Sequence, residues 1–182
     1  TESRTGRSLP ILLNEHVFLD DAGCLGAGAR TIGEVATSCG QLVRNASALS
    51  VLLTKFDQPF PTPELRELTI AGLRRAIPAT VHGGIFARRG TPRAQDGVLT
   101  QRELSWAGEL LRFACFLGEA RLEAADGRPL GALEPHKRTQ LADFLSPLID
   151  QHRQLWLQRS RPGGLDRSAR WLERILEALR AE

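Results

Sequence analysis

Histidines are the first residues to test for chemistry, because imidazole can act as a base or as a metal ligand. No spacing brings two of the four histidines to one helix face as ligands: His16, His82, His136 and His152. His152 falls within an apolar helical stripe, a position typical of a hydrogen-bonded packing residue. His82-Gly83-Gly84 lacks the lysine and the helix-opening serine of a phosphate-binding loop. The histidines therefore predict neither a metal site nor a nucleotide site.

Cysteines and paired acids are the other candidates for chemistry. Cys24, Cys39 and Cys115 have neither metal-ligand nor redox spacing, so we expect buried free thiols and a reducing, cytoplasmic compartment. Asp20-Asp21 could carry out acid–base work on a sugar. These acids precede a segment of small residues, however, and capping of a helix is the favoured role. We expect no catalytic residue, no cofactor and no metal.

Arginine dominates the basic residues. The 24 basic residues include only two lysines, and 21 acidic residues bring the formal net charge to +3. Nucleic-acid binding needs basic side chains gathered on one face. In the last third of the chain acids such as Asp150, Asp166 and Glu173 interleave with the arginines, which indicates a solvated face with ion pairs. We expect neither nucleic acid nor a membrane as a partner.

Length and periodicity predict an all-α fold. A chain of 182 residues suits one domain with one core. Apolar residues recur at helical spacing and no segment alternates, so we predict an antiparallel bundle of about six helices over residues 1–182. No apolar run approaches the ~18 residues of a membrane span, and the N-terminus lacks a signal-peptide core. Because the chain starts at Thr1 and contains no methionine, we expect a piece of a longer protein.

Breaking and capping residues set the expected bounds of these helices. Asp20-Asp21 should open the first, whose glycines predict close backbone approach to a neighbour. Thr62-Pro63 should start the third, and Thr100 with Glu103 forms a capping box for the fourth. The expected spans are about 22–41, 45–56, 62–77, 101–125, 135 to the Pro-Gly-Gly turn at 161–164, and from that turn to about 179.

The remaining segments are expected to lack helix or to bend it. Residues 1–9 should be flexible, and 78–97 should form a long loop behind Pro78. Pro147 lies inside a continuous apolar seam, so it should bend its helix rather than end it. Asp166 should cap the last helix. The helix over 101–125 has two apolar stripes, which predicts a place in the middle of the bundle.

Three strings occur in this order along the chain: Leu12-Leu-Asn-Glu-His-Val-Phe-Leu-Asp-Asp-Ala-Gly23, Glu103-Leu-Ser-Trp-Ala-Gly-Glu-Leu-Leu-Arg-Phe-Ala-Cys115 and Leu155-Trp-Leu-Gln-Arg-Ser-Arg-Pro-Gly-Gly-Leu165. Together they resemble the helical C-terminal region of bacterial family 20 glycoside hydrolases, the β-N-acetylhexosaminidase group. The resemblance covers about residues 10–180. Ser160 departs from it, since asparagine is expected to be commoner there in the family.

The resemblance implies a parent enzyme with an upstream catalytic (β/α)8 barrel that hydrolyses terminal N-acetylhexosamine residues. It also implies that an Asp-Glu pair in the barrel performs the chemistry, together with the substrate's own acetamido group. The barrel motif that holds this pair is absent here, because His82-Gly83-Gly84 continues into Ile85-Phe86. A barrel also needs about 250 residues. No catalytic residue is therefore carried over, and this chain alone is expected not to be an enzyme.

Three functions follow as hypotheses. The first is a non-catalytic helical domain or fragment of such a glycoside hydrolase, whose partner is the barrel of the same parent or a homodimer partner. The second is an independent helical protein-interaction module that uses the 78–97 loop or the final helix. The third is an arginine-rich nucleic-acid binder.

Overall fold

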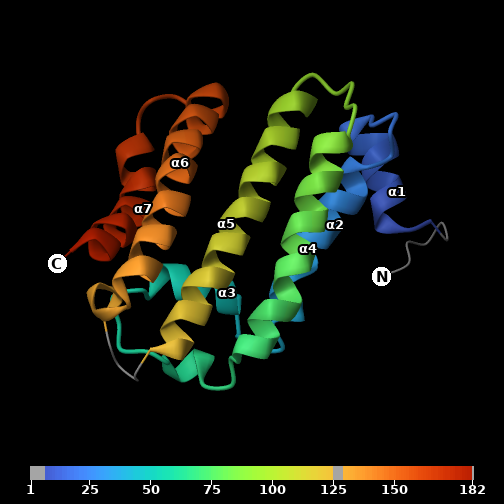
Figure 1. Cartoon of the computed structure of the whole chain (residues 1–182). Coiled ribbons are helices and arrows are strands. Elements are labelled where there is room, and N and C mark those ends of the chain that lie inside the picture. Colours follow the sequence, from blue (N-terminus) through green and yellow to red (C-terminus); the bar gives the residue numbers. More distant parts are fainter. Residues whose placement is uncertain (1–6, 125–128, 182) are drawn as a thin grey trace.

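The chain folds as an all-α bundle, as its periodicity predicts. The computed structural model describes residues 7–124 and 129–181, and within these ranges the only β-type contact is a bridge between Asp20 and Pro92. None of the described helices combines the length and hydropathy needed to cross a membrane. The α-helices are α1 (Leu9–Leu13), α2 (Leu25–Ser38), α3 (Ala48–Thr54), α4 (Ile70–Arg89), α5 (Gly97–Glu123), α6 (Pro135–Arg159) and α7 (Leu165–Arg180) (Figure 1).

The N-terminal part holds a helix that the sequence did not predict. Helix α1 has Pro10 in its first turn and continues into a π-helical turn, Asn14–Phe18, which Leu19 ends with a φ of 49°. Of the segment 1–9 that was predicted to be flexible, residues 1–6 lie outside the described ranges and Leu9 already belongs to α1. The described residues therefore contain seven α-helices rather than six.

The prediction of a helix over 62–77 followed by a loop over 78–97 is wrong. Pro63–Leu65 is only a short 3₁₀ turn, and α4 begins at Ile70, where the Thr69 hydroxyl accepts the Gly72 N–H at 3.0 Å. The helix then runs through Pro78 to Arg89. Pro78 is exposed and removes a single backbone bond, a loss that packing of α4 against both α2 and α5 offsets. Only residues 90–96 remain a loop.

The glycines of α2 allow the close approach that the sequence predicts, and the neighbour is α4. A Cβ added at Gly28 would lie 3.0 Å from the Ala87 nitrogen and 3.2 Å from the Gly83 oxygen. At the α2–α4 contact the backbones approach so closely that a side chain at position 28 would need its neighbours to shift. On the other side of α4, a Cβ at Gly108 of α5 would make an ordinary contact with the Thr80 oxygen at 3.4 Å. Helices α2, α4 and α5 therefore form one tight layer.

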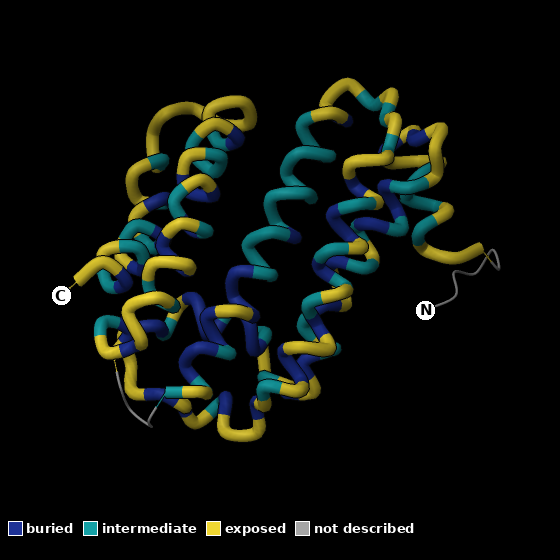
Figure 2. The backbone as a smooth tube through the Cα atoms, in the orientation of Figure 1, coloured by how far each residue is buried: buried dark blue, intermediate teal, exposed yellow. Residues whose placement is uncertain are grey.

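Helix α5 lies in the middle of the fold, as its two apolar stripes predict (Figure 1). Its C-terminal half, around Phe113 and Leu117, is buried among α3, α6 and α7 in the main core. Most residues of its N-terminal half, 99–112, are only half-buried (Figure 2). The capping box predicted at Thr100 is wrong, because α5 begins one turn earlier, at Gly97. An apolar helix is thus left half-covered at one end.

The α6–α7 hairpin packs on the open side of α5. Pro147 lies inside α6, which continues to Arg159 as predicted. Gly164 adopts a φ of 88° and precedes α7. The prediction that Asp166 caps α7 is wrong. Gly164 occupies the cap position, and the Asp166 side chain, 96% exposed, instead pairs with Arg153 at 3.3 Å.

Asp20 ties the start of α2 to the 90–96 loop. It is buried, and its carboxylate accepts the N–H groups of Ala22, Cys24, Leu25 and Thr91 at 2.6–3.2 Å. Burial raises the pKa of this carboxyl, but the four backbone donors outweigh burial and lower it. Capping by Asp20 is therefore confirmed, and the same side chain also fixes a loop 71 residues away.

Replacing Asp20 should cost far more stability than replacing its neighbour. We expect Asp20→Asn to lower the free energy of unfolding by about 2 kcal/mol at pH 7, because charge-assisted hydrogen bonds are lost. The matched control is Asp21→Asn. The Asp21 side chain is 59% exposed and pairs with Arg93, so this change should alter the free energy of unfolding by less than about 0.5 kcal/mol. Urea unfolding followed by circular dichroism measures both.

The Asp20 effect should also depend on pH in one direction. Because the pKa is lowered on folding, the stabilisation is present above the unfolded value of about 3.9 and is lost as pH falls through the folded value. The difference between wild type and Asp20→Asn should therefore shrink toward pH 2. A difference that grows on acidification contradicts this assignment.

Two glycines of α2 should respond oppositely to alanine. A Cβ at Gly33 meets no atom within 4 Å, so Gly33→Ala should stabilise by about 0.5–1 kcal/mol through the unfolded chain. A Cβ at Gly26 would lie 2.1 Å from the Pro10 oxygen, so Gly26→Ala should destabilise by about 1–3 kcal/mol. Chemical denaturation gives both values. Equal effects would show that α1 does not pack closely on α2.

Candidate functional site

The residues singled out for chemistry lie apart from one another. His16, His82 and His136 are exposed, and in the described part of the chain no three metal-binding side chains gather in one place. Cys39 and Cys115 are buried free thiols as predicted, whereas Cys24 is half-buried. His152 donates to or accepts from the Ser168 hydroxyl at 2.9 Å, which confirms its prediction as a hydrogen-bonded packing residue.

A groove lies between the N-terminal half of α5 and the C-terminal half of α6. We call it the tryptophan groove, and its volume is about 340 Å³. Aromatic and aliphatic side chains make most of its wall, and charged side chains lie at one end. The residues that line it are Glu103, Trp106, Ala107, His152, Leu155, Trp156, Arg159 and Ser160.

The aromatic wall of the tryptophan groove is held rigidly. The Trp106 and His152 rings stack with centroids 5.1 Å apart, and Trp156 meets His152 edge-on at 6.1 Å. Both indoles donate their N–H to backbone oxygens, Trp106 to Leu148 at 2.9 Å and Trp156 to Arg161 at 3.0 Å. The ring faces and edges thus remain as the contact surface, while the polar atoms of both indoles are already satisfied.

Arg159 closes one end of the tryptophan groove. Its guanidinium binds both Glu103 oxygens, at 3.0 and 2.6 Å, and also pairs with Asp96. It donates to the Thr100 hydroxyl at 3.2 Å as well, so the two residues of the expected capping box bind α6 instead. Hydrogen bonds to Glu103 and Asp96 raise the pKa of Arg159, and Arg159 lowers the pKa of Asp96. Glu103 is therefore held as an ion-pair partner of Arg159.

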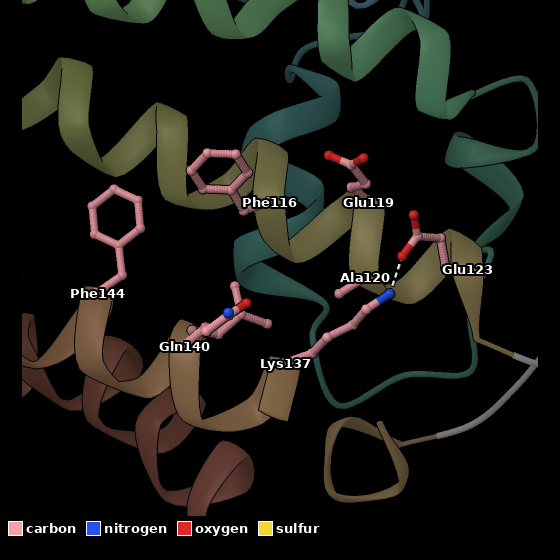
Figure 3. Close-up of a pocket in the computed structure, with 8 residues that line it drawn as sticks. Phe116, Glu119, Ala120, Glu123, Lys137, Gln140 and Phe144 are labelled. Carbon is pink, nitrogen blue, oxygen red and sulfur yellow. Dashed lines mark hydrogen bonds and ion pairs between the residues drawn. The ribbon is translucent and has the colours of Figure 1, made fainter. Parts of the chain in front are cut away.

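A second cavity lies between the other halves of α5 and α6 (Figure 3). We call it the phenylalanine pocket, and its volume is about 350 Å³. Two aromatic rings stand at one end, and an ion pair between Lys137 and Glu123 stands at the other. Its lining residues are Phe116, Glu119, Ala120, Glu123, Lys137, Gln140, Leu141 and Phe144.

The helices that carry the lining residues of both cavities are predictable from the sequence, but the meeting of these residues in a cavity is not. By sequence, Trp106 lies in one of the two apolar stripes predicted for the helix over 101–125, and Phe144 and Trp156 lie in the apolar seam around Pro147. Which of these side chains share a cavity depends on where α5 and α6 diverge. One signal was available for the phenylalanine pocket. Phe116 lies outside both apolar stripes of its helix, and 37% of it is exposed. A large aromatic residue off the core face indicates a surface contact or a pocket.

Comparisons with known proteins give no further assignment. No protein-family model, no curated protein and no solved structure matches this chain. The resemblance to family 20 glycoside hydrolases therefore stays a prediction, based on the three strings alone.

His152 should make the fold sensitive to mild acid. Burial lowers the pKa of this imidazole, and the neighbouring Arg153 lowers it further. Since the unfolded chain binds a proton near pH 6.5 and the folded chain resists it, stability should fall as pH drops below about 6.5. His152→Gln should flatten this dependence in urea unfolding between pH 7.5 and 5. The exposed His16 supplies the control His16→Gln, which should keep the slope; equal slopes in all three proteins contradict this role.

Proposed function

We propose that this chain is a non-catalytic helical domain of a glycoside hydrolase resembling the β-N-acetylhexosaminidases. In this proposal the tryptophan groove packs against the catalytic barrel of the same parent protein. The parent hydrolyses terminal N-acetylhexosamine residues in the barrel, and the helical domain supports that barrel or forms part of its surroundings. The buried thiols Cys39 and Cys115 favour a reducing, cytoplasmic setting.

One observation carries the proposal: two of the strings that resemble the family meet in space at the tryptophan groove. String 103–115 supplies Glu103, Trp106 and Ala107, and string 155–165 supplies most of the opposite wall. Arg159 joins the two strings through Glu103. Residues 56 positions apart in the chain thus form one surface, and their shared position supports a common role.

The surface at the groove has the character of an interface. Trp106 and Trp156 are half-buried, and most of α5 from 99 to 112 is half-buried although both its stripes are apolar. Tryptophan and arginine are enriched among the residues that dominate binding energy. Both indole N–H groups are already bonded, so a partner can cover the rings without leaving these donors unpaired. A second domain packed on the groove would bury the apolar side chains that the bundle leaves half-exposed.

Three acids on and near the tryptophan groove pair with arginines. Glu103 and Asp96 bind Arg159, and Glu173 binds Arg153 at 2.5 Å. We therefore expect the purified chain to release no p-nitrophenol from p-nitrophenyl N-acetylglucosaminide, measured by absorbance with a full-length family enzyme as the positive control. Turnover that survives repeated purification contradicts a non-catalytic role.

Binding of the chain to the barrel should depend on side chains that line the tryptophan groove, and not on apolar side chains that lie beside it. We expect the chain to bind the barrel of its parent, supplied as a separate polypeptide, and Trp156→Ala to weaken binding at least tenfold in isothermal titration calorimetry. The control is Leu157→Ala, which removes an adjacent side chain that is 53% exposed and lies outside the groove. Equal losses for both variants, or none for Trp156→Ala, contradict docking through the groove.

A second candidate is an independent interaction module. Most of the 78–97 segment predicted as its contact loop belongs to helix α4, and exposed apolar side chains in α1 and the turn after it favour this candidate instead. Leu9, Ile11, Val17 and Leu19 are each 43–55% exposed there. In this case the partner is a second copy of the chain, and sedimentation equilibrium should give a dimer that Val17→Ser breaks and Trp156→Ala leaves intact. A monomer at all concentrations removes this candidate.

A further inference from the structure

The phenylalanine pocket has an apolar floor and two aromatic rings at one end. Ala120 and Leu141 form the floor, at 6% and 5% exposure. The Phe144 ring is held by the edge of the buried Phe113, whose ring centre lies 6.0 Å away. Phe116 stands 5.9 Å from Phe144 with the two rings tilted by 54°. A third aromatic ring can therefore lie against both rings, and such contacts are favourable beyond the area they bury.

The charged side chains at the other end of the pocket are paired with one another. Glu119 accepts the Nε–H of Arg74, on the neighbouring helix α4, at 2.7 Å, and Arg74 also lies 3.7 Å from Glu123. Lys137 reaches across the pocket to pair with Glu123 (Figure 3). Two acids and two bases thus balance at this end, and the pocket presents no net charge to a ligand.

An ionic ligand would have to displace a partner from one of these pairs. A cation would compete with Arg74 and Lys137 for the two carboxylates, and an anion would compete with the carboxylates for the two bases. A cation at the rings would also meet the Arg112 guanidinium, which already lies 4.9 Å from the centre of Phe144. An uncharged ligand leaves every pair intact. The paired charges therefore favour a neutral occupant.

Volume and hydrogen bonding narrow this class further. An apolar cavity of about 150 Å³ is large enough to bind benzene. The pocket has a volume of about 350 Å³, so one ring with a short side chain fits. Among the described residues that line it, Gln140 alone has an uncharged polar side chain, and Figure 3 shows it between Phe144 and Lys137. Its amide can donate to and accept from a ligand hydroxyl.

We propose that the phenylalanine pocket binds small uncharged molecules with one aromatic ring and a hydroxyl group, the ring against Phe116 and Phe144 and the hydroxyl at Gln140. This site is separate from the tryptophan groove. Its α5 and α6 residues, 116–123 and 137–144, lie outside the three strings that resemble the glycoside hydrolases. The proposal therefore stands whether or not the chain docks on a barrel.

Three phenylalkyl probes that differ in charge test the site on the whole wild-type chain. They are 2-phenylethanol, 2-phenylethylammonium and 3-phenylpropanoate, titrated at pH 7 while backbone amide shifts are recorded by NMR. We expect 2-phenylethanol to bind about fivefold more tightly than either ion, the upper end of what one exposed ion pair contributes. Its largest shifts should fall in residues 116–123 and 137–144. An ion that binds as tightly, no saturable shift with 2-phenylethanol, or shifts confined to other residues would overturn the proposal.

Variants at the ring and at the amide locate the bound molecule. Phe116→Ala should weaken 2-phenylethanol about fivefold, and Gln140→Leu should weaken it about threefold through the lost hydrogen bond. Phe86→Ala is the control for the ring, because Phe86 is also 37% exposed but lies on α4 outside the pocket. Gln154→Leu is the control for the amide, since Gln154 is exposed on α6 outside the pocket. Weakening by either control as large as that of its partner variant contradicts the location.

A third variant tests whether the paired charges exclude ions. Glu119→Gln removes one carboxylate partner of Arg74, so 3-phenylpropanoate should bind about fivefold more tightly than to the wild type. Binding of 2-phenylethanol should stay unchanged, and the ammonium ion should remain weaker than the alcohol. Circular dichroism checks that each variant is folded. An unchanged ranking of the three probes contradicts the role assigned to these pairs.

Discussion

Close backbone packing of α4 against α2 and α5 is the constraint on which the rest of the structure depends. At Gly108 a Cβ would make an ordinary contact with Thr80 at 3.4 Å. A Cβ added at Gly28 would lie 3.0–3.2 Å from Ala87 and Gly83, and one added at Gly83 would lie 2.6 Å from Ile32 Cγ1, so the α2–α4 contact favours glycine. This contact explains why α4 continues through Pro78 and accepts two adjacent glycines. The intrinsic helix penalties of these residues, about 1 kcal/mol for each glycine, are offset by contacts that only small residues allow.

The layer formed by α2, α4 and α5 covers one side of α5 and leaves the other side for α6 and α7. One side of α5 lies against α4, and the α6–α7 hairpin packs on the other side most closely near Phe113 and Leu117. Toward the N-terminus of α5, side-chain hydrogen bonds from Trp106 to Leu148, from Arg159 to Glu103 and from Arg102 to Gln158 join the two helices. Exposed ion pairs contribute little stability, typically 0–1 kcal/mol. The tryptophan groove is therefore a direct consequence of where the core ends.

Local features were readable from the sequence, and long-range ones were not. The helical class, the cap at Asp20 and the packing role of His152 follow from spacing and residue type. The local pattern predicts that the helix ends before Pro78. Tertiary contacts on both sides of α4 offset the backbone hydrogen bond that Pro78 removes, and the helix continues to Arg89. Thr100 with Glu103 fits a capping box, yet Arg159, which no local pattern brings near, binds both. For the same reason each tryptophan was placed on an apolar face while their common groove was not foreseen.

We propose that the tryptophan groove is an interface that a second domain covers. Hydroxyl-radical footprinting, read by mass spectrometry, tests this proposal by comparing the chain alone with the same chain joined to the barrel of the proposed parent enzyme. The account predicts that oxidation of Trp106 and Trp156 falls several-fold in the joined protein, while Phe116 in the phenylalanine pocket oxidises at an unchanged rate. Unchanged oxidation of both tryptophans would contradict it.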